Sequence, residues 1–326
     1  MSDLVTGGAG FLGYHLARGL SDAGRDVVIV DNMVRSTADP RLADLLARPG
    51  VTFIEADLCD PHLVNDLPSV ERVFHLAAHN GTQNFYENPH DVIRNSTIPT
   101  LNLLERYAKR EQVSLFAYTG SSESYAAAVT RGLTPVPTPE DTPLIIEDIV
   151  NPRWSYAAGK LHGEIALATA ADQFGVPWQI WRVHNCFGPR MGAKHVIPDF
   201  TERALRDVFE LYGHADTRTF LYVDDAVDIM QGLAASPDAM RQVINVGGRG
   251  EMTMLELGQQ IMKVLGKTGD IDCKDSPKGS VARRAPDVTK LLGLLPEFAY
   301  RDFDASLKLT LDSVIEEVAA GHYSTK

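Results

Sequence analysis

The run Thr6-Gly7-Gly8-Ala9-Gly10-Phe11-Leu12-Gly13 places glycines at positions 7, 10 and 13, close to the start of the chain. It follows a short apolar stretch and opens a helical pattern over residues 11–20, with leucines on one face. Glycine permits a tight turn and a close approach of the backbone to a pyrophosphate, and the N-terminus of a helix favours that negative charge. The run therefore predicts a strand, a phosphate-binding turn and a helix, which together begin an α/β fold.

Short apolar runs alternate with helical patterns over residues 1–183. Each run is nearly continuous, as expected of strands that are buried on both faces of a parallel sheet. The alternation predicts a doubly wound parallel sheet of the Rossmann type. The later strands are predicted at 27–30, 51–54, 72–76, 113–118 and 178–183, and the later helices at 91–110 and 156–174.

The pattern changes after residue 183, where the periodicity becomes mixed. We predict a Rossmann domain of residues 1–183 and about 220–247, with the chain returning to the sheet near residues 221–230 and 243–246. Residues of about 184–219 and 248–326 would form a smaller C-terminal α/β domain for the substrate. Within it, Thr253 and Glu256 have the spacing of a capping box that opens a helix to about residue 265, and residues 309–318 suit a last helix.

Composition and charge narrow the possible partners. The chain has 326 residues and a formal net charge of −12, which predicts no attraction to nucleic acid or to an anionic membrane surface. No apolar run reaches the roughly 18 residues that a membrane span needs, and we expect no signal peptide. Three widely spaced cysteines, Cys59, Cys186 and Cys273, show neither a disulfide framework nor a metal-ligand pattern, which predicts no metal site and favours a cytoplasmic location.

Carboxylates after the second and third strands indicate the nucleotide that binds the glycine turn. Asp31 ends the second predicted strand, where a carboxylate accepts hydrogen bonds from an adenosine ribose diol and repels a 2′-phosphate. This pattern favours NAD over NADP. Asp57 and Leu58 follow the third strand, where Asp57 could contact adenine or merely cap a helix.

Tyr156 and Lys160 are spaced i and i+4, so they lie on one face of the predicted helix 156–174. An ammonium group and a nearby nicotinamide cation would both lower the pKa of the phenol, and a phenolate can take a proton from a sugar hydroxyl. Such a pair is common by chance, so it counts as evidence only together with the glycine run and Ser121. Ser121 follows the predicted strand 113–118 at the carboxyl edge of the sheet, where its hydroxyl could bridge substrate and phenol.

These residues together resemble the extended short-chain dehydrogenase/reductase family, specifically its NAD-dependent nucleotide-sugar epimerases, dehydratases and decarboxylases. The resemblance spans nearly the whole chain. It rests on Thr6 to Gly13, Asp31-Asn32, Asp57-Leu58, His75-Leu76-Ala77-Ala78, Asn95 with Asn102-Leu103-Leu104-Glu105, Ser121-Ser122-Glu123-Ser124-Tyr125, Tyr156 with Lys160, Arg182 to Pro189, Arg218 with Tyr222-Val223-Asp224-Asp225, Asn245-Val246-Gly247 and Arg284-Ala285-Pro286-Asp287.

The resemblance implies a tightly held NAD that is reduced and reoxidised within one turnover, a nucleoside-diphosphate sugar as substrate, and a homodimer. It implies cofactor contacts from Gly7, Gly10, Phe11, Leu12, Gly13, Asp31, Asn32, Asp57, Leu58, Ala77, Ala78, Tyr156 and Lys160. Asn185 and Arg218 would hold the sugar diphosphate and Arg284 would clamp its pyrophosphate, because a guanidinium group binds phosphate oxygens bidentately. His79 faces the sugar pocket by position, as a sugar ligand or as a structural histidine, and Ser122 is also expected to bind the substrate.

Three reactions share oxidation of the sugar at C4. A 4-epimerase needs no further acid or base, a 4,6-dehydratase needs both, and a decarboxylase must place the substrate carboxylate. We predict 4-epimerisation, because it requires only Ser121, Tyr156 and Lys160. Decarboxylation of a UDP-glucuronate type of substrate, or 4,6-dehydration, remains the alternative through Glu123 of the Ser122-Glu123 pair. A non-catalytic NAD-binding protein and an enzyme that releases NADH in each cycle are less favoured.

Overall fold

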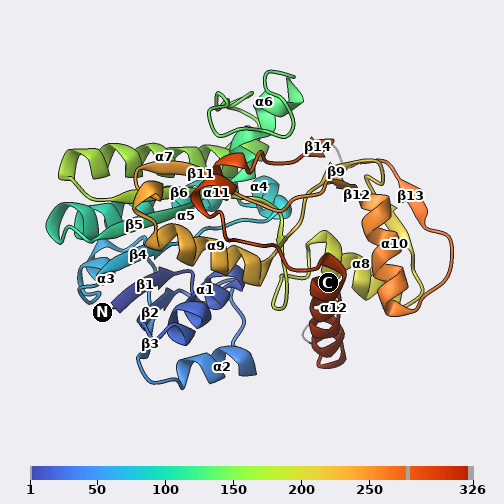
Figure 1. Ribbon diagram of the computed structural model, residues 1–326, viewed down its shortest axis with the longest axis horizontal. Coiled ribbons are helices and arrows are strands. Elements are labelled where there is room, and N and C mark those ends of the chain that lie inside the picture. Colours follow the sequence, from blue (N-terminus) through green and yellow to red (C-terminus); the bar gives the residue numbers. More distant parts are fainter. Residues whose placement is uncertain (1, 277–279, 322–326) are drawn as a thin grey trace.

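A seven-stranded parallel sheet forms the centre of the computed structural model, which describes residues 2–276 and 280–321 (Figure 1). The strands lie in the order β11-β6-β5-β4-β1-β2-β3. In chain order they are β1 (Ser2–Thr6), β2 (Asp26–Asp31), β3 (Val51–Glu55), β4 (Arg72–His75), β5 (Leu115–Ser121), β6 (Trp178–Val183) and β11 (Gln242–Val246).

Helices cover both faces of this sheet, and each face has its own apolar core. One core packs α1 (Phe11–Asp22), α2 (Pro40–Leu46), α9 (Val223–Ala235) and α11 (Thr289–Leu294) on the sheet. The other packs α3 (Pro61–Asn65), α5 (Pro89–Leu103), the π-helical turn Leu104–Arg110 and α7 (Ser155–Phe174). The order of strands reverses between β1 and β4, which confirms the doubly wound fold and places its ligand crevice at the carboxyl ends of these two strands.

A third apolar core lies to one side of the sheet, on the right in Figure 1. It is built on α8 (Val196–Leu205), α10 (Met254–Leu265) and α12 (Phe303–Ala319). Short strands accompany it: β7 (Cys186–Phe187), β8 (Glu210–Tyr212), β9 (Thr217–Arg218), β10 (Leu221–Tyr222), β12 (Met252–Thr253), β13 (Asp272–Lys274) and β14 (Arg283–Arg284). This separate core supports the two-domain division, which we keep as a proposal.

Short helical segments complete the connections near the carboxyl edge of the sheet. They are α4 (Thr82–Glu87) and α6 (Ala126–Thr130), together with the 3-10 turns η2 (Ser122–Tyr125), η3 (Pro152–Trp154) and η4 (Pro237–Ala239).

Several predicted elements differ in the structure. Residues 221–230 do not rejoin the sheet, because β10 pairs with β7 and the chain then enters α9, whose buried side chains recur at helical spacing. Strand β5 runs on to Ser121, so this serine ends the strand instead of following it. The capping box is confirmed: the Thr253 hydroxyl accepts from the Glu256 amide and the Glu256 carboxylate accepts from the Thr253 amide.

No helix within residues 2–276 and 280–321 is both long and apolar enough to cross a bilayer. The same part of the chain contains no group of three or more His, Cys, Asp and Glu side chains arranged to hold a metal ion.

Candidate active site

The glycine turn between β1 and α1 leaves no room for side chains. Gly7 has φ of +67°, and a Cβ there would lie 2.9 Å from the backbone of Ala77. A Cβ on Gly13 would lie 2.1 Å from the carbonyl oxygen of Gly7. Gly10 precedes Phe11 and Leu12 at the start of α1, which begins without a side-chain cap. The turn therefore offers backbone N–H groups to an anion, as a pyrophosphate requires.

Asp31 lies beside this turn at the end of β2 and is buried. Its carboxylate accepts hydrogen bonds from the Ala9 amide at 3.1 Å, the Met33 amide at 2.9 Å and the Ser36 hydroxyl at 3.0 Å. These contacts fix the glycine turn and the loop after β2, while the ribose contact of Asp31 remains a prediction. The sequence pattern did not reveal this structural function of Asp31.

The other residues expected around the cofactor lie along the same edge. Ala77 and Ala78 follow β4, next to Gly7. Asn32 accepts a hydrogen bond from the Val34 amide in the loop after β2. Asp57 accepts from the Cys59 amide at 2.9 Å and lies 3.6 Å from Arg94, while the Leu58 carbonyl accepts from Asn102. In the protein's own contacts Asp57 shapes a turn, so its adenine contact remains a prediction.

Ser121, Tyr156 and Lys160 come together at the carboxyl end of β5. Tyr156 lies in the first turn of α7, is buried, and stacks on Phe85 with ring centroids 5.1 Å apart. Lys160 lies one turn further along α7, and its Nζ donates to the Thr119 carbonyl at 2.7 Å. That Nζ lies 6.0 Å from the centre of the Tyr156 ring. The arrangement is that of a phenol with a hydroxyl partner and a nearby amine.

The acid strength of Tyr156 departs from the expectation. Burial raises its pKa to about 12, more than its hydrogen bond with Ser121 lowers it. Burial also lowers the pKa of Lys160 to about 8. The protein alone thus does not show the expected lowering of the Tyr156 pKa, because burial outweighs the interactions that lower it, and the Lys160 ammonium group bonds the Thr119 carbonyl. NAD, held by the glycine turn, would supply a hydride acceptor and a positive charge that favours the phenolate.

Glu123 is enclosed by two arginines. Its carboxylate accepts from Arg284 at 2.7 Å and from Arg153 at 3.1 Å, and its side chain is 15% exposed. Burial raises the pKa of Glu123, but Arg284 and Arg153 outweigh this effect, so the pKa lies below its ordinary value. Because Glu123 lies two residues beyond Ser121, whose hydroxyl accepts from the Glu123 amide, this ionised cluster adjoins the Tyr156 site.

The predicted diphosphate ligands meet at a small sheet beside this cluster. Arg284 on β14 lies in register with Arg218 on β9. Burial and the neighbouring Arg284 lower the pKa of Arg218 to about 10. Asn185, at φ of +22°, donates to the Thr219 carbonyl at 3.0 Å, which ties the segment after β6 to β9. Arg284, which the sequence predicted to bind the substrate's pyrophosphate, is bonded to Glu123 in the structure.

The remaining candidates and two missed residues lie at the same edge. His79 follows β4, and its pKa lies below the ordinary value, chiefly because of burial and secondly because of the nearby Arg35 charge. Ser122 is buried beside Glu123. Arg35, which the sequence analysis did not consider, donates to Asn80 and so reaches from the loop after β2 to the loop after β4. Arg153 lies three residues before Tyr156, and nothing in the sequence pairs it with Glu123.

Comparisons with known proteins point to one family of enzymes. The model of the NAD dependent epimerase/dehydratase family matches residues 4–247. UDP-glucuronic acid decarboxylase 5 from Arabidopsis thaliana is 30% identical over 314 residues, covering 93% of this chain and 86% of that relative. The structure of UDP-glucose 4-epimerase from Thermotoga maritima with UDP-glucose is 26% identical at a TM-score of 0.85, covering 98% of this chain and 100% of the other. UDP-glucuronic acid 4-epimerase from Bacillus cereus, solved with NAD, shares the fold at 24% identity and a TM-score of 0.83, covering 97% and 99% of the two chains.

The chain belongs to the NAD-dependent epimerase/dehydratase family, which includes epimerases, dehydratases and decarboxylases of nucleotide sugars. NAD is its cofactor. The residues fit that group, because the glycine turn has no room for a Cβ at Gly7 or Gly13 and so leaves its backbone bare, α1 begins uncapped, and the buried carboxylate of Asp31 ends β2, where a ribose acceptor is expected.

Proposed function

We propose that this chain is a nucleotide-sugar decarboxylase that acts on a uronate sugar of the UDP-glucuronate type. The observation that carries the proposal is the cluster of Glu123, Arg153 and Arg284 beside Ser121 and Tyr156. Two guanidinium groups share one carboxylate, so the cluster keeps one net positive charge. A second carboxylate, that of a uronate, suits this charge.

In the proposed decarboxylation, Tyr156 and Ser121 handle the proton at C4. Tyr156, bonded to Ser121, takes the proton of the C4 hydroxyl as hydride leaves that carbon. The product is a β-keto acid. Its C5–C6 bond breaks with loss of carbon dioxide, and the electron pair moves towards the C4 oxygen, where the Tyr156 proton stabilises it. A proton from solvent then adds to C5 in place of the lost carboxylate, and hydride returns to C4 as Tyr156 gives its proton back to the C4 oxygen.

Dehydration fits the cluster less well. A 4,6-dehydratase would use Glu123 as the base that removes the C5 proton. Two arginine hydrogen bonds hold this carboxylate and depress its pKa, which weakens it as a base. A decarboxylase needs no such base, since the bond to carbon dioxide supplies the electron pair.

4-Epimerisation is a second candidate. It requires only Ser121, Tyr156 and Lys160, and the chain matches a UDP-glucose 4-epimerase over nearly its full length. The intermediate would have to turn over in the site before hydride returns. The ionised cluster would then have no part in the chemistry, which is why we rate decarboxylation above it.

Glu123→Gln tests these alternatives. The purified protein is mixed with UDP-glucuronate and with neutral UDP-hexoses, nicotinamide absorbance is followed in a single turnover, and products are identified by mass and NMR. A decarboxylase forms a product lacking carbon dioxide from the uronate, and Glu123→Gln accumulates NADH after oxidation, because Arg153 and Arg284 lose the carboxylate that positions them. An isomer of unchanged mass, formed equally well by Glu123→Gln, would establish the epimerase instead. Glu147→Gln, which removes the surface partner of Arg131, is the matched control and should behave as wild type.

We also propose that the enzyme is a cytoplasmic homodimer. Three free cysteines, Cys59, Cys186 and Cys273, suit a reducing compartment. Exposed apolar side chains gather on the adjoining helices α5 and α7, and a second copy of the chain would cover them: Ile93, Ile98, Leu101 and Ile165.

A further inference from the structure

Arg190 lies outside the residues that the reaction uses, yet it is among the best-anchored side chains near the cofactor turn. It follows Gly188-Pro189, its side chain is 5% exposed, and its backbone has φ of +67°. A residue other than glycine adopts this left-handed conformation only where the surroundings impose it. The backbone is held here because the Pro189 carbonyl bonds His15 of α1 at 2.8 Å.

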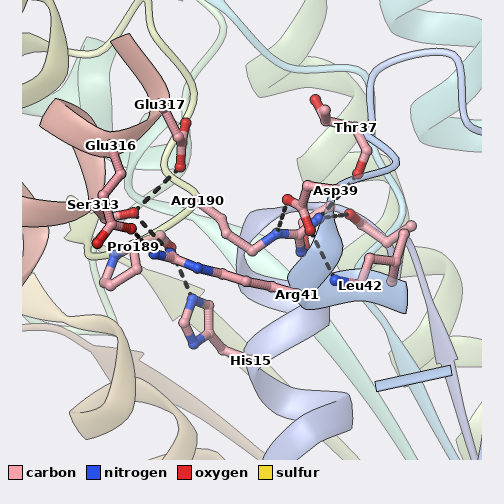
Figure 2. A network of polar contacts seen from close by, with 12 residues as sticks. His15, Thr37, Asp39, Arg41, Leu42, Pro189, Arg190, Ser313, Glu316 and Glu317 are labelled. Carbon is pink, nitrogen blue, oxygen red and sulfur yellow. Dashed lines mark hydrogen bonds and ion pairs between the residues drawn. The ribbon is translucent and has the colours of Figure 1, made fainter. Parts of the chain in front are cut away.

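The Arg190 guanidinium joins three separate segments (Figure 2). It donates to the Ala9 carbonyl of the glycine turn and to the Thr37 carbonyl of the loop after β2, each at 3.2 Å. It pairs with Asp39 at 2.7 Å and lies over the Tyr14 ring, 4.2 Å from its centre. Asp39 in turn caps α2 by accepting from the Leu42 amide at 2.8 Å.

Ala9 is therefore held at both ends of its backbone. Its amide donates to Asp31 and its carbonyl accepts from Arg190. With that carbonyl turned towards a cation, the N–H groups at the start of α1 remain available to an anion. The positive charge itself is balanced by Asp39, so the contribution of Arg190 is geometric.

We infer that Arg190 is a positioning residue for NAD: it holds the glycine turn and the loop after β2 in the arrangement that binds the cofactor. The inference rests on NAD as cofactor and holds for any of the three reactions. Arg190 and Asn185 both lie in the segment between β6 and α8, so Arg190 also ties the cofactor turn to the segment that carries Asn185.

Arg190→Gln tests this inference, with Arg41→Gln as the matched control. Arg41 lies on α2 in the same region, but it bonds Ser313 and Glu316 of α12 and touches neither cofactor loop (Figure 2). NAD affinity is measured by calorimetry, with thermal unfolding of the NAD-free proteins alongside. Arg190→Gln should weaken NAD binding roughly tenfold or more, because several charge-assisted hydrogen bonds are lost, whereas Arg41→Gln should not.

A split between binding and turnover separates positioning from general stability. At saturating NAD, Arg190→Gln should keep its turnover within about threefold of wild type, since no reacting atom has moved. An NAD affinity within twofold of wild type would overturn the inference, as would an equal loss in Arg41→Gln. If Arg190→Gln does not fold, Asp39→Asn decides, because it breaks the ion pair and leaves the arginine in place: unchanged NAD affinity there would also overturn it.

Discussion

Tyr156 is a weak acid in the field of its own protein, with a pKa of about 12, so a partner must make it a base. Tyr156→Phe keeps the ring that stacks on Phe85 and removes only the hydroxyl. We expect turnover to fall roughly 10²–10⁴-fold, the usual contribution of a positioned acid–base group, while folding and NAD binding persist. The wild type should also gain activity with rising pH along a limb that the variant lacks. Steady-state rates over a pH range check this, and a near-normal rate in the variant would contradict it.

A second prediction concerns Lys160 and the pH dependence of the protein's stability. Burial lowers its pKa to about 8 from 10.5, so between these values the unfolded chain binds more protons than the folded one. The free energy of unfolding therefore rises with pH across that window. Below pH 8 the buried ammonium group destabilises the folded state to its full extent. Lys160→Met should unfold at a higher temperature than wild type below pH 8, with the advantage shrinking towards pH 10.5. Calorimetric melting checks it, with the exposed Lys109→Met as control; a pH-independent difference would contradict it.

At the scale of the elements, periodicity predicted most of the sheet and its helices. Strand β11 and helix α7 lie within a residue of their expected bounds. The last helix begins at Phe303 instead of residue 309, because Asp302 caps it by accepting from the Ala305 amide. The expected helix 91–110 ends as a π-helical turn from Leu104. Such local hydrogen-bond choices carry no periodic signal.

Asp31 at the end of β2 is expected to control both the affinity for NAD and the discrimination against NADP. The carboxylate repels a 2′-phosphate and also holds the Ala9 amide and the Ser36 hydroxyl. Asp31→Asn keeps an acceptor oxygen and loses the charge, so it should bind NAD moderately less tightly and discriminate less against NADP. Asp31→Ala loses the loop contacts as well and should bind both poorly. Calorimetry with both cofactors checks this; unchanged selectivity in Asp31→Asn would show that the charge does not select the cofactor.

At the scale of the whole molecule, the site joins residues that are far apart in the sequence, and this is what sequence reasoning could not supply. Motifs located Ser121, Tyr156 and Arg284, but not the contact of Arg284 with Glu123. That contact depends on a buried network in which Asn245 bonds the Tyr125 hydroxyl and the carbonyls of Thr138 and Asp287. The network fastens the turn that carries Glu123 to the segment that carries Arg284.

The last prediction concerns the homodimer proposed through α5 and α7. Leu101 on α5 and Ile165 on α7 are 48% and 57% exposed, and these two helices pack side by side. Covering such apolar surface with a second copy is favourable, and charges placed there would have to be buried unpaired. The wild type should therefore sediment as a dimer and Leu101→Glu/Ile165→Glu as a monomer with unchanged helix content. Leu309→Glu, on the 55% exposed position of α12, is the control and should remain dimeric. A wild type that sediments as a monomer at micromolar concentration would contradict the predicted dimer.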